Sequence, residues 1–380
     1  MLLTLLLACQ PKPPPAPPGV LLVTVDTWRS DSLHPDWSPN AWALADGGLS
    51  FRNAWSPIGL TSPAHASLFT GLLPPVHGVR GNNHHGYQLA PSFETVAETL
   101  QAQGIATGGF VSAYPVAGDA GLDQGFDVFS GPEQGERSGE LAVNEALAWI
   151  AEQQGPWFAW VHVYEPHGPY TPPAADLAAA SKQPAPDPEV LNYRGEVHAA
   201  DRILGPLYTA AQQRGAHIVL TADHGEVLTE EPCSWRHAVS SSPMVLRVPM
   251  VVSGPSVQPG VRDDMVGLTD LRDTLLHLSG VQAPTRGVLD LSTREVWLGE
   301  SGLCEAQCAP GCSPEGVLGK DRVAFGEAGG MYRDRPGVGG YGDPMLARAL
   351  EGYPRPEAGA LPGDLEKGAA LGYTTQGAPR

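Results

Sequence analysis

The sequence predicts an α/β fold, in which helices cover both faces of a mostly parallel sheet and form an α/β/α sandwich. The chain has 380 residues, which is enough for one large domain with a buried core. Five short apolar runs are typical of strands that are buried on both faces of a sheet. Amphipathic helical patterns lie between these runs, and this alternation of strand and helix favours a parallel sheet.

The individual elements can be placed along the chain from this alternation. The expected strands are residues 20–25, 105–111, 157–163, 217–221 and 248–252. The clearest helical patterns are residues 92–103, 139–153, 197–214 and 265–279. After about residue 290 the periodicity weakens, and Gly and Pro become frequent. We therefore expect one α/β/α domain over residues 19–290 and a small irregular, cysteine-containing extension over residues 291–380.

The charge balance excludes one broad class of function. The chain has 41 Asp and Glu against 23 Lys and Arg, which gives a formal net charge of −18. Nucleic-acid binding depends on basic patches that release counterions, and no such patch is visible in the sequence. A general nucleic-acid binder is therefore not expected.

The N-terminal segment predicts export. Residues 1–8 are apolar and end in a small residue directly before Cys9. This run is shorter than the roughly 20 residues that span a bilayer, and it is typical of the end of a signal peptide. The LLAC sequence also resembles the bacterial lipobox, in which the cysteine is lipidated; an ordinary cleaved signal or a buried strand is the alternative. We expect a periplasmic or cell-surface lipoprotein that is anchored to the membrane through Cys9, with residues 9–18 as a Pro-rich tether.

Four further cysteines remain for the rest of the chain. In an oxidising compartment an even number of cysteines favours disulfides, and a metal cluster of the three closely spaced cysteines is the alternative. If all four pair internally, Cys233 must bond to one of the three that lie close together, Cys304, Cys308 and Cys312.

Polar side chains that follow two of the expected strands predict a metal site. Asp26 comes directly after the first strand, and Asp223 and His224 come directly after the fourth. Open α/β sheets bind ligands at the carboxyl ends of their strands. A strand-end aspartate taken alone is more often a cap or turn residue. Two carboxylates and an imidazole at one edge, however, favour a divalent cation.

Thr61 is a candidate nucleophile in the segment IGLTSPAHASLFTG. Ser62 and Pro63 resemble a helix N-cap followed by a first-turn proline, so Thr61 is expected just ahead of a helix N-terminus. The N–H groups there favour an anion. A hydroxyl that touches a cation at this point could ionise and attack phosphorus or sulfur. A threonine that only caps the helix is the alternative.

Histidines follow two of the same strands. His167 lies just beyond the third strand, with His162 and Glu165 close by, and His237 lies on the loop after Asp223 and His224. A single histidine in such a place is more often structural than functional. Their joint position after successive strands indicates a site.

Taken in order, these segments resemble the sulfatase branch of the alkaline phosphatase superfamily over roughly residues 20–290. VLLVTVDTWRSDSL resembles its first strand and metal-binding aspartate, TSPAHASLFTG its nucleophile segment, WVHVYEPHGPY its DPHxPY segment and TADHGE its second metal-binding segment. The resemblance implies an alkaline phosphatase-like α/β/α sandwich and an ester hydrolase. It implies that Asp26, Asp223 and His224 are metal ligands and that Thr61 is the nucleophile, which also contacts the metal. His65 stands at the position of the CxPxR arginine. His167 and His237 are implied to be histidines of the substrate site.

Some positions depart from the family pattern. Sulfatases of the formylglycine type oxidise a Cys or Ser at the nucleophile, and threonine cannot give that aldehyde. Thr27 stands where the family usually has a second aspartate, and no GKWH-like segment is found. Threonine nucleophiles occur in related phosphodiesterases and in phosphoglycerol or phosphoethanolamine transferases. The loss of one carboxylate shifts the metal preference from calcium towards zinc or manganese.

We therefore expect a hydrolase or transferase that cleaves sulfuric or phosphoric esters through Thr61 and one divalent cation, with phosphoesters slightly favoured. The cation is expected to be zinc, manganese or calcium, and His167 and His237 bind the anion, assist the leaving group or complete a second metal site. The expected substrate is a small-molecule or glycan ester, with specificity in loops such as residues 79–88, and no protein partner is inferred. The alternatives are a two-zinc phosphodiesterase and an inactive surface lipoprotein that binds a glycan or partner.

Overall fold

The predicted α/β class is confirmed by an eight-stranded sheet with strand order β5-β4-β6-β1-β7-β8-β2-β9. The computed structural model describes residues 19–230, 237–301, 322–327, 329–335, 339–351 and 353. The expected signal peptide, the tether and all five cysteines lie outside the described residues. Within those residues, no helix is both long and apolar enough to cross a membrane.

The central strands lie where the apolar runs predict them. β1 and β6 have the predicted limits, and β4, β7 and β8 agree to within two residues at each end. Three strands of three residues each, β5 at one edge of the sheet and β2 and β9 towards the other, were not expected, because such short segments carry too little pattern to detect. The strands of the large sheet are β1 Val20–Val25, β2 Leu49–Phe51, β4 Ala106–Val111, β5 Val128–Ser130, β6 Trp157–Val163, β7 His217–Ala222, β8 Met250–Ser253 and β9 Gly260–Arg262.

The register of the parallel strands positions the site. β1 lies between β6 and β7 and pairs with both in parallel, so that Val25 is opposite Val163 and Ala222. The residues that follow these strands therefore emerge together at one edge. β8 pairs with β7 and β2 in the antiparallel sense, which makes the sheet mostly rather than wholly parallel. Every residue of β1, β6 and β7 is buried, which accounts for their continuous apolar character.

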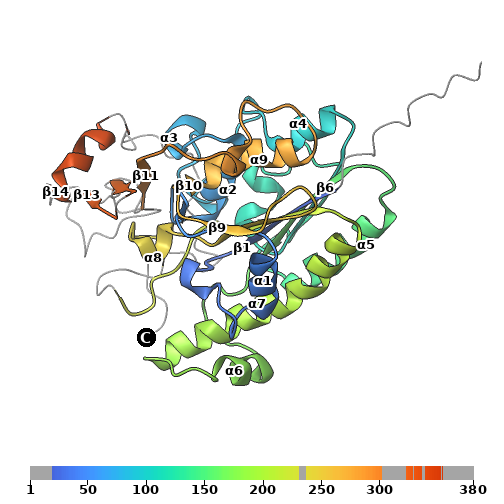
Figure 1. Cartoon of the computed structure of the whole chain (residues 1–380), viewed down its shortest axis with the longest axis horizontal. Helices are drawn as coiled ribbons and strands as arrows, with labels where there is room; N and C mark the ends of the chain where they lie inside the picture. The colour runs from blue at the N-terminus through green and yellow to red at the C-terminus, as the bar shows by residue number, and fades with distance from the viewer. Residues whose placement is uncertain are drawn as a thin grey trace, which may run out of the picture.

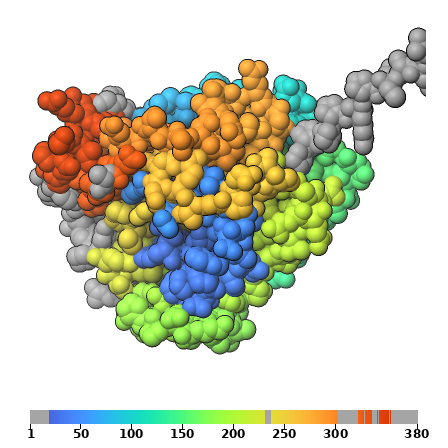
Figure 2. Space-filling view, viewed as in Figure 1, coloured from blue at the N-terminus to red at the C-terminus, as the bar shows by residue number. Residues whose placement is uncertain are grey.

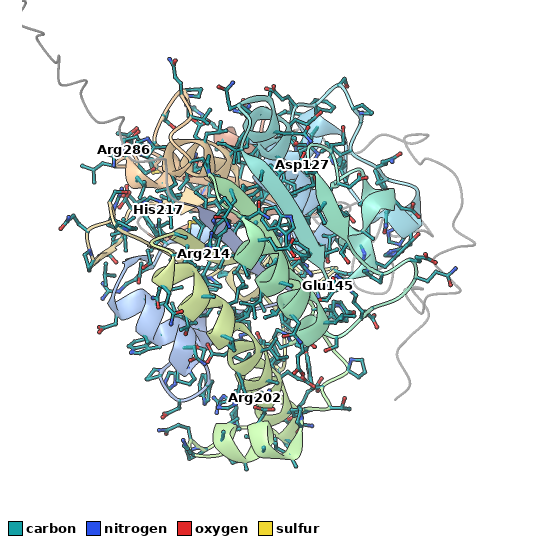
Figure 3. The ribbon with its side chains drawn as sticks, turned by 90° about the vertical axis from the view of Figure 1, so that its right-hand side faces the viewer. Asp127, Glu145, Arg202, Arg214, His217 and Arg286 are labelled. Atoms are coloured by element: carbon teal, nitrogen blue, oxygen red, sulfur yellow. The ribbon has the colours of Figure 1, made fainter. Side chains whose placement is uncertain are left out.

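Helices cover both faces of this sheet (Figure 1). α2, α4 and α9 lie on one face, and α1, α5 and α7 lie on the other (Figure 1). Figure 3 shows α5 and α7 across the sheet, with Glu145 and Arg202 labelled on them. The helices are α1 Pro39–Asp46, α2 Thr61–Thr70, α3 Pro74–His77, α4 Val96–Ala102, α5 Gly139–Glu152, α6 Ala174–Ala180, α7 Pro188–Gln213, α8 Pro243–Leu246 and α9 Leu271–Leu278.

Three helices begin later or earlier than predicted. α4 begins at Val96 and not at residue 92, because the Thr95 side chain caps it by accepting the Glu98 N–H. α7 begins well before residue 197, because the Asp187 side chain accepts a hydrogen bond from the Glu189 N–H and Pro188 is the first helical residue. α9 is shorter than the predicted helix over 265–279, because its first residues form the short strand β10 Val266–Gly267, which pairs with β3 Ala54–Trp55.

The C-terminal region corrects the expectation of an irregular extension. β11 Val296–Glu300, β12 Arg322–Gly326, β13 Met331–Arg335 and β14 Gly339–Gly342 form an antiparallel sheet. These strands are short and rich in glycine, so their periodicity in the sequence is weak. Trp297, Val323 and Phe325 pack against Trp55 and Leu246 of the main domain. Figure 2 shows this part of the chain as a lobe at one side of the molecule.

Candidate active site

Asp26 and Asp223 meet at the carboxyl edge of the sheet, as the sequence predicts. Each comes directly after its strand, and the strands β1 and β7 are neighbours in parallel register. The Asp26 N–H continues the β1–β6 ladder by donating to the Val163 carbonyl at 2.9 Å. Both aspartates and His224 are completely buried. Buried carboxylates require compensation by a proton, a cation or hydrogen bonds.

The compensation by hydrogen bonds is incomplete at three atoms that face one another. Within the described part of the chain, Asp26 Oδ1, Asp223 Oδ2 and His224 Nε2 have no hydrogen-bond partner. His224 Nε2 lies 3.5 Å from Asp223 Oδ2 and 3.9 Å from Asp26 Oδ1. His224 Nδ1 donates to the Gly225 carbonyl at 3.0 Å, so Nε2 carries a lone pair. Two carboxylate oxygens and one imidazole nitrogen fit a divalent cation.

The electrostatics of these groups also favour a cation. Burial raises the pKa of the Asp223 carboxyl to about 6. Burial, with the charges of Asp223 and Glu226 nearby, raises the pKa of Asp26 well above its usual range. Burial lowers the pKa of His224 to about 3, so its ring is neutral at neutral pH and its lone pair is available. A divalent cation between them would offset the cost of burying two carboxylates.

Thr61 is the first residue of α2, with Leu60 as its N-cap. This differs from the expectation that the helix begins after Ser62. The Ser62 N–H donates to Asn82 Oδ1 at 2.9 Å, and the Ser62 hydroxyl donates to the Pro115 carbonyl at 2.6 Å, so Ser62 does not cap the helix. Thr61 Oγ1 lies 3.4 Å from Asp26 Oδ2, which places the expected nucleophile beside the candidate cation ligands.

His65 is held by hydrogen bonds at both ring nitrogens. Its Nδ1 donates to the Thr61 carbonyl at 2.8 Å, and its Nε2 accepts from the Thr24 hydroxyl at 3.0 Å. Thr24 in turn accepts from Trp160 Nε1 at 2.9 Å. The ring is completely buried, and burial lowers its pKa. Through its Nδ1 hydrogen bond, His65 holds the backbone carbonyl of Thr61, and its role as a replacement for the family arginine stays a prediction.

His162 is a site residue that the sequence reasoning noted only as a neighbour of His167. It is completely buried on β6, and its Nε2 lies 3.7 Å from Asp26 Oδ2. Neither ring nitrogen has a hydrogen-bond partner in the described part of the chain. A histidine inside the apolar run WFAWVHV was the signal that could have identified it. His65, His162 and Asp223 form a second group at metal-binding distances, but the nitrogens of His65 are already used.

His167 and His237 come together above the cation ligands. The ring of His237 stacks on His224 with centroids 4.5 Å apart, and the rings of His167 and His237 lie 5.1 Å apart. Burial lowers the pKa of His167 to about 3, so this ring is neutral at neutral pH. In the described ranges, neither histidine belongs to a group that could hold a metal ion.

Glu226 is a further residue of the site that the sequence reasoning did not single out. It is completely buried, accepts from the Tyr170 hydroxyl at 2.9 Å, and lies 3.3 Å from His237 Nδ1. An imidazole N–H that faces a carboxylate is held in one tautomer and orientation. Its position in the DHGE segment after β7 was the available signal.

Thr27, at the position of the absent second aspartate, shapes the site through its backbone. Its φ is 52°, a left-handed conformation that a β-branched residue rarely adopts. Its N–H donates to Asp223 Oδ1 at 3.3 Å, and its carbonyl accepts from the Tyr193 hydroxyl at 2.8 Å. The strained turn thus contributes to orienting Asp223, so that its Oδ2 faces Asp26 and His224.

Comparisons with known proteins agree with this geometry. The sulfatase family model matches residues 18–281. Bovine (Bos taurus) arylsulfatase A is 38% identical over 106 residues, a stretch of 24% of this chain and 20% of the bovine enzyme. Human (Homo sapiens) arylsulfatase A is 37% identical over 105 residues, again 24% of this chain and 20% of the relative. This chain thus spans about a fifth of the length of these curated relatives.

One solved structure shares the fold over most of its length. The phosphonate monoester hydrolase of Silicibacter pomeroyi aligns with a TM-score of 0.69 and 18% identity, covering 88% of this chain and 93% of that chain.

Proposed function

This chain belongs to the sulfatase family, and from that premise we propose that it hydrolyses sulfate or phosphate esters with Thr61 as the nucleophile. The observation that carries the proposal is the convergence of three unpartnered ligand atoms, on Asp26, Asp223 and His224, beside the Thr61 hydroxyl. A divalent cation bound there would neutralise the carboxylates and lower the pKa of a neighbouring hydroxyl.

The residues of the chain account for each stage of such a reaction. The Thr61 hydroxyl faces Asp26 Oδ2, which accepts its proton as Oγ1 attacks phosphorus or sulfur. A bond from Thr61 Oγ1 to that atom forms, the ester bond breaks, and the leaving alkoxide takes up a proton from solvent water. Water then attacks the covalent ester on Thr61 and restores the hydroxyl. His65 keeps the Thr61 backbone in place throughout.

The charges around the site favour an ester group with one negative charge. Arg29 is already paired with Asp31 and Glu230, so its charge is largely balanced. Glu226 lies beside His237, and His167 is a neutral ring. We propose a phosphodiester, a phosphonate monoester or a sulfate monoester rather than the dianion of a phosphate monoester. Because threonine cannot form the aldehyde of formylglycine-dependent sulfatases, phosphoesters remain slightly favoured.

The names of structural neighbours support this range of substrates without deciding within it. The relative from Silicibacter pomeroyi is a phosphonate monoester hydrolase. Another neighbour, with a TM-score of 0.68 and 14% identity over 88% of this chain and 94% of its own, was solved with its substrate D-glucosamine-2-N,6-O-disulfate. A glycan ester or a smaller phosphoester is therefore the substrate class that we propose.

Replacement of Thr61 tests the proposal. Thr61→Ala should lower kcat by about a thousandfold or more on an aryl phosphodiester, phosphonate or sulfate, while Thr61→Ser should retain a measurable part of it. The same assay with an aryl phosphate monoester as a fourth substrate tests the charge argument, which predicts that this dianion is turned over more slowly than the three monoanionic esters. Turnover in Thr61→Ala at the wild-type rate would contradict the assignment of the nucleophile.

We also propose that the enzyme acts outside the cytoplasm as a lipoprotein anchored at Cys9. This proposal depends on the N-terminal sequence, with its apolar run, lipobox-like LLAC and Pro-rich tether.

A further inference from the structure

A buried ion pair joins the C-terminal sheet to the main domain. Glu300, the last residue of β11, has a completely buried side chain, and the Arg80 side chain that faces it is 10% exposed. Arg80 Nε donates to Glu300 Oε1 at 3.1 Å, and Arg80 Nη2 donates to Glu300 Oε2. A buried pair is a poor source of net stability, because both charges lose their hydration. Its position suggests another role.

The backbone of β11 holds the chain just before Thr61. The Glu300 N–H donates to the Pro57 carbonyl at 2.9 Å, and Glu300 forms a parallel bridge with Ile58. Gly299 permits this close approach, since a Cβ there would lie 2.9 Å from the Pro57 carbonyl oxygen. Trp297 Nε1 also donates to the Ser56 carbonyl, at 3.1 Å. β11 thus acts as a strand partner for the segment that leads to the nucleophile.

The side chain of Glu300 holds the chain just after Thr61 through Arg80. Two residues beyond Arg80, Asn82 Oδ1 accepts the Ser62 N–H at 2.9 Å, and the Asn83 N–H faces the Ser62 hydroxyl at 3.3 Å. Ser62 directly follows Thr61. Glu300 therefore connects to both sides of Thr61, by its main chain on one side and by its carboxylate on the other.

We propose that Glu300 is a positioning residue for Thr61, and that the C-terminal sheet is part of the catalytic unit. The inference rests on the proposed function, since it takes Thr61 as the nucleophile. Displacement of a reacting group by about 1 Å can reduce a rate by about a hundredfold. A clamp on both sides of the first residue of α2 is suited to prevent such a displacement.

The variant Glu300→Gln tests the proposal, because it keeps the size of the side chain and removes the carboxylate charge that faces Arg80. The expected result is a fall in kcat of about 10- to 100-fold, with KM within about twofold of the wild type and metal content unchanged. The matched control is Asp264→Asn, which breaks the pair with Arg262 on β9, where the side chains are 15% and 16% exposed. The control should lose stability but keep its kcat.

A second readout does not depend on turnover. Amide hydrogen exchange over residues 57–62 should be faster in Glu300→Gln than in Asp264→Asn. If Glu300→Gln does not fold, Trp297→Phe removes the hydrogen bond to Ser56 and keeps most of the packing, and it should show the same two effects at smaller size. Wild-type kcat per folded molecule and unchanged exchange in these variants would overturn the inference. If instead the wild type turns over none of the esters, the proposed function fails, while the exchange result still tests the clamp.

Discussion

Asp223→Asn should have opposite effects on the metal-free and metal-loaded protein. Asp223 and Asp26 are both completely buried, and Asp223 Oδ2 has no hydrogen-bond partner among the residues that the structure describes. An asparagine Oδ1 can still accept from the N–H groups of Thr27 and His224, which Asp223 Oδ1 accepts at 3.3 and 2.8 Å. The substitution therefore removes a buried charge while the hydrogen bonds that orient the side chain remain.

The magnitude follows from the shifted pKa. Burial raises the pKa of Asp223 from 3.8 to about 6, which corresponds to about 3 kcal/mol against the charged form. The unfolded chain releases the Asp223 proton more readily than the folded chain. The destabilisation of the folded protein by the Asp223 charge is therefore absent below pH 4, grows as the pH rises to 6 and is constant above pH 6. At pH 8 the variant avoids the cost of burying this charge, but its asparagine amide, which lacks a hydrogen-bond partner, destabilises the folded protein by about 1 to 2 kcal/mol. The metal-free variant should thus be as stable as the wild type or about 1 to 2 kcal/mol more stable.

The assay is unfolding at pH 8 of chelator-treated protein, with and without added zinc, manganese or calcium. The wild type should gain stability with the cation that it binds, because ligand binding to the native state adds RT ln(1 + [L]/Kd). Asp223→Asn should lose most of this gain. A metal-free variant that is less stable than the wild type by 2 kcal/mol or more, and that still gains stability with the cation, would refute the assignment of the site.

Three further predictions follow from the structure. His162→Phe should weaken cation binding by about 10- to 100-fold in calorimetric titration, because it removes a buried imidazole whose Nε2 lies 3.7 Å from Asp26 Oδ2 and can hydrogen-bond that carboxylate once a cation is bound; binding equal to that of the wild type would exclude this role. Burial lowers the pKa of His77 to about 3, and its Nδ1 accepts from the Val79 N–H. Between pH 7 and pH 5 the unfolded chain therefore gains a proton on this ring and the folded chain does not, which should lower the free energy of unfolding by about 2 kcal/mol. In urea unfolding, His77→Asn should reduce that pH dependence, and an unchanged dependence would contradict the account. Cys9→Ser should move the protein from the membrane to the soluble fraction, and unchanged fractionation would exclude the lipid anchor.

The sequence predicts the centre of the fold and the meeting of Asp26 and Asp223 for a physical reason. β1 and β6 are buried on both faces, and so they are continuous apolar runs that end sharply. Parallel pairing then places the residues after β1 and β7 side by side. Asp26 and Asp223 meet because of this rule alone.

The rest depends on contacts between distant parts of the chain. His65 is hydrogen-bonded to Thr24, and Asn82 accepts an N–H group from the first turn of the helix that begins at Thr61. Neither contact can be predicted from the local sequence pattern. Glu300 and Arg80 are 220 residues apart. β12 to β14 are short and rich in glycine, so their pairing, and not their periodicity, makes them a sheet.

The most direct test of the central claim is identification of the covalent intermediate. Wild-type protein is mixed with an aryl phosphodiester or aryl sulfate, quenched in acid during the first turnovers, and digested for peptide mass spectrometry. The account predicts the transferred phosphoryl or sulfuryl group on Thr61, and its absence from Thr61→Ala together with loss of turnover. Full turnover with no modified Thr61, or with the group on another residue, would contradict it.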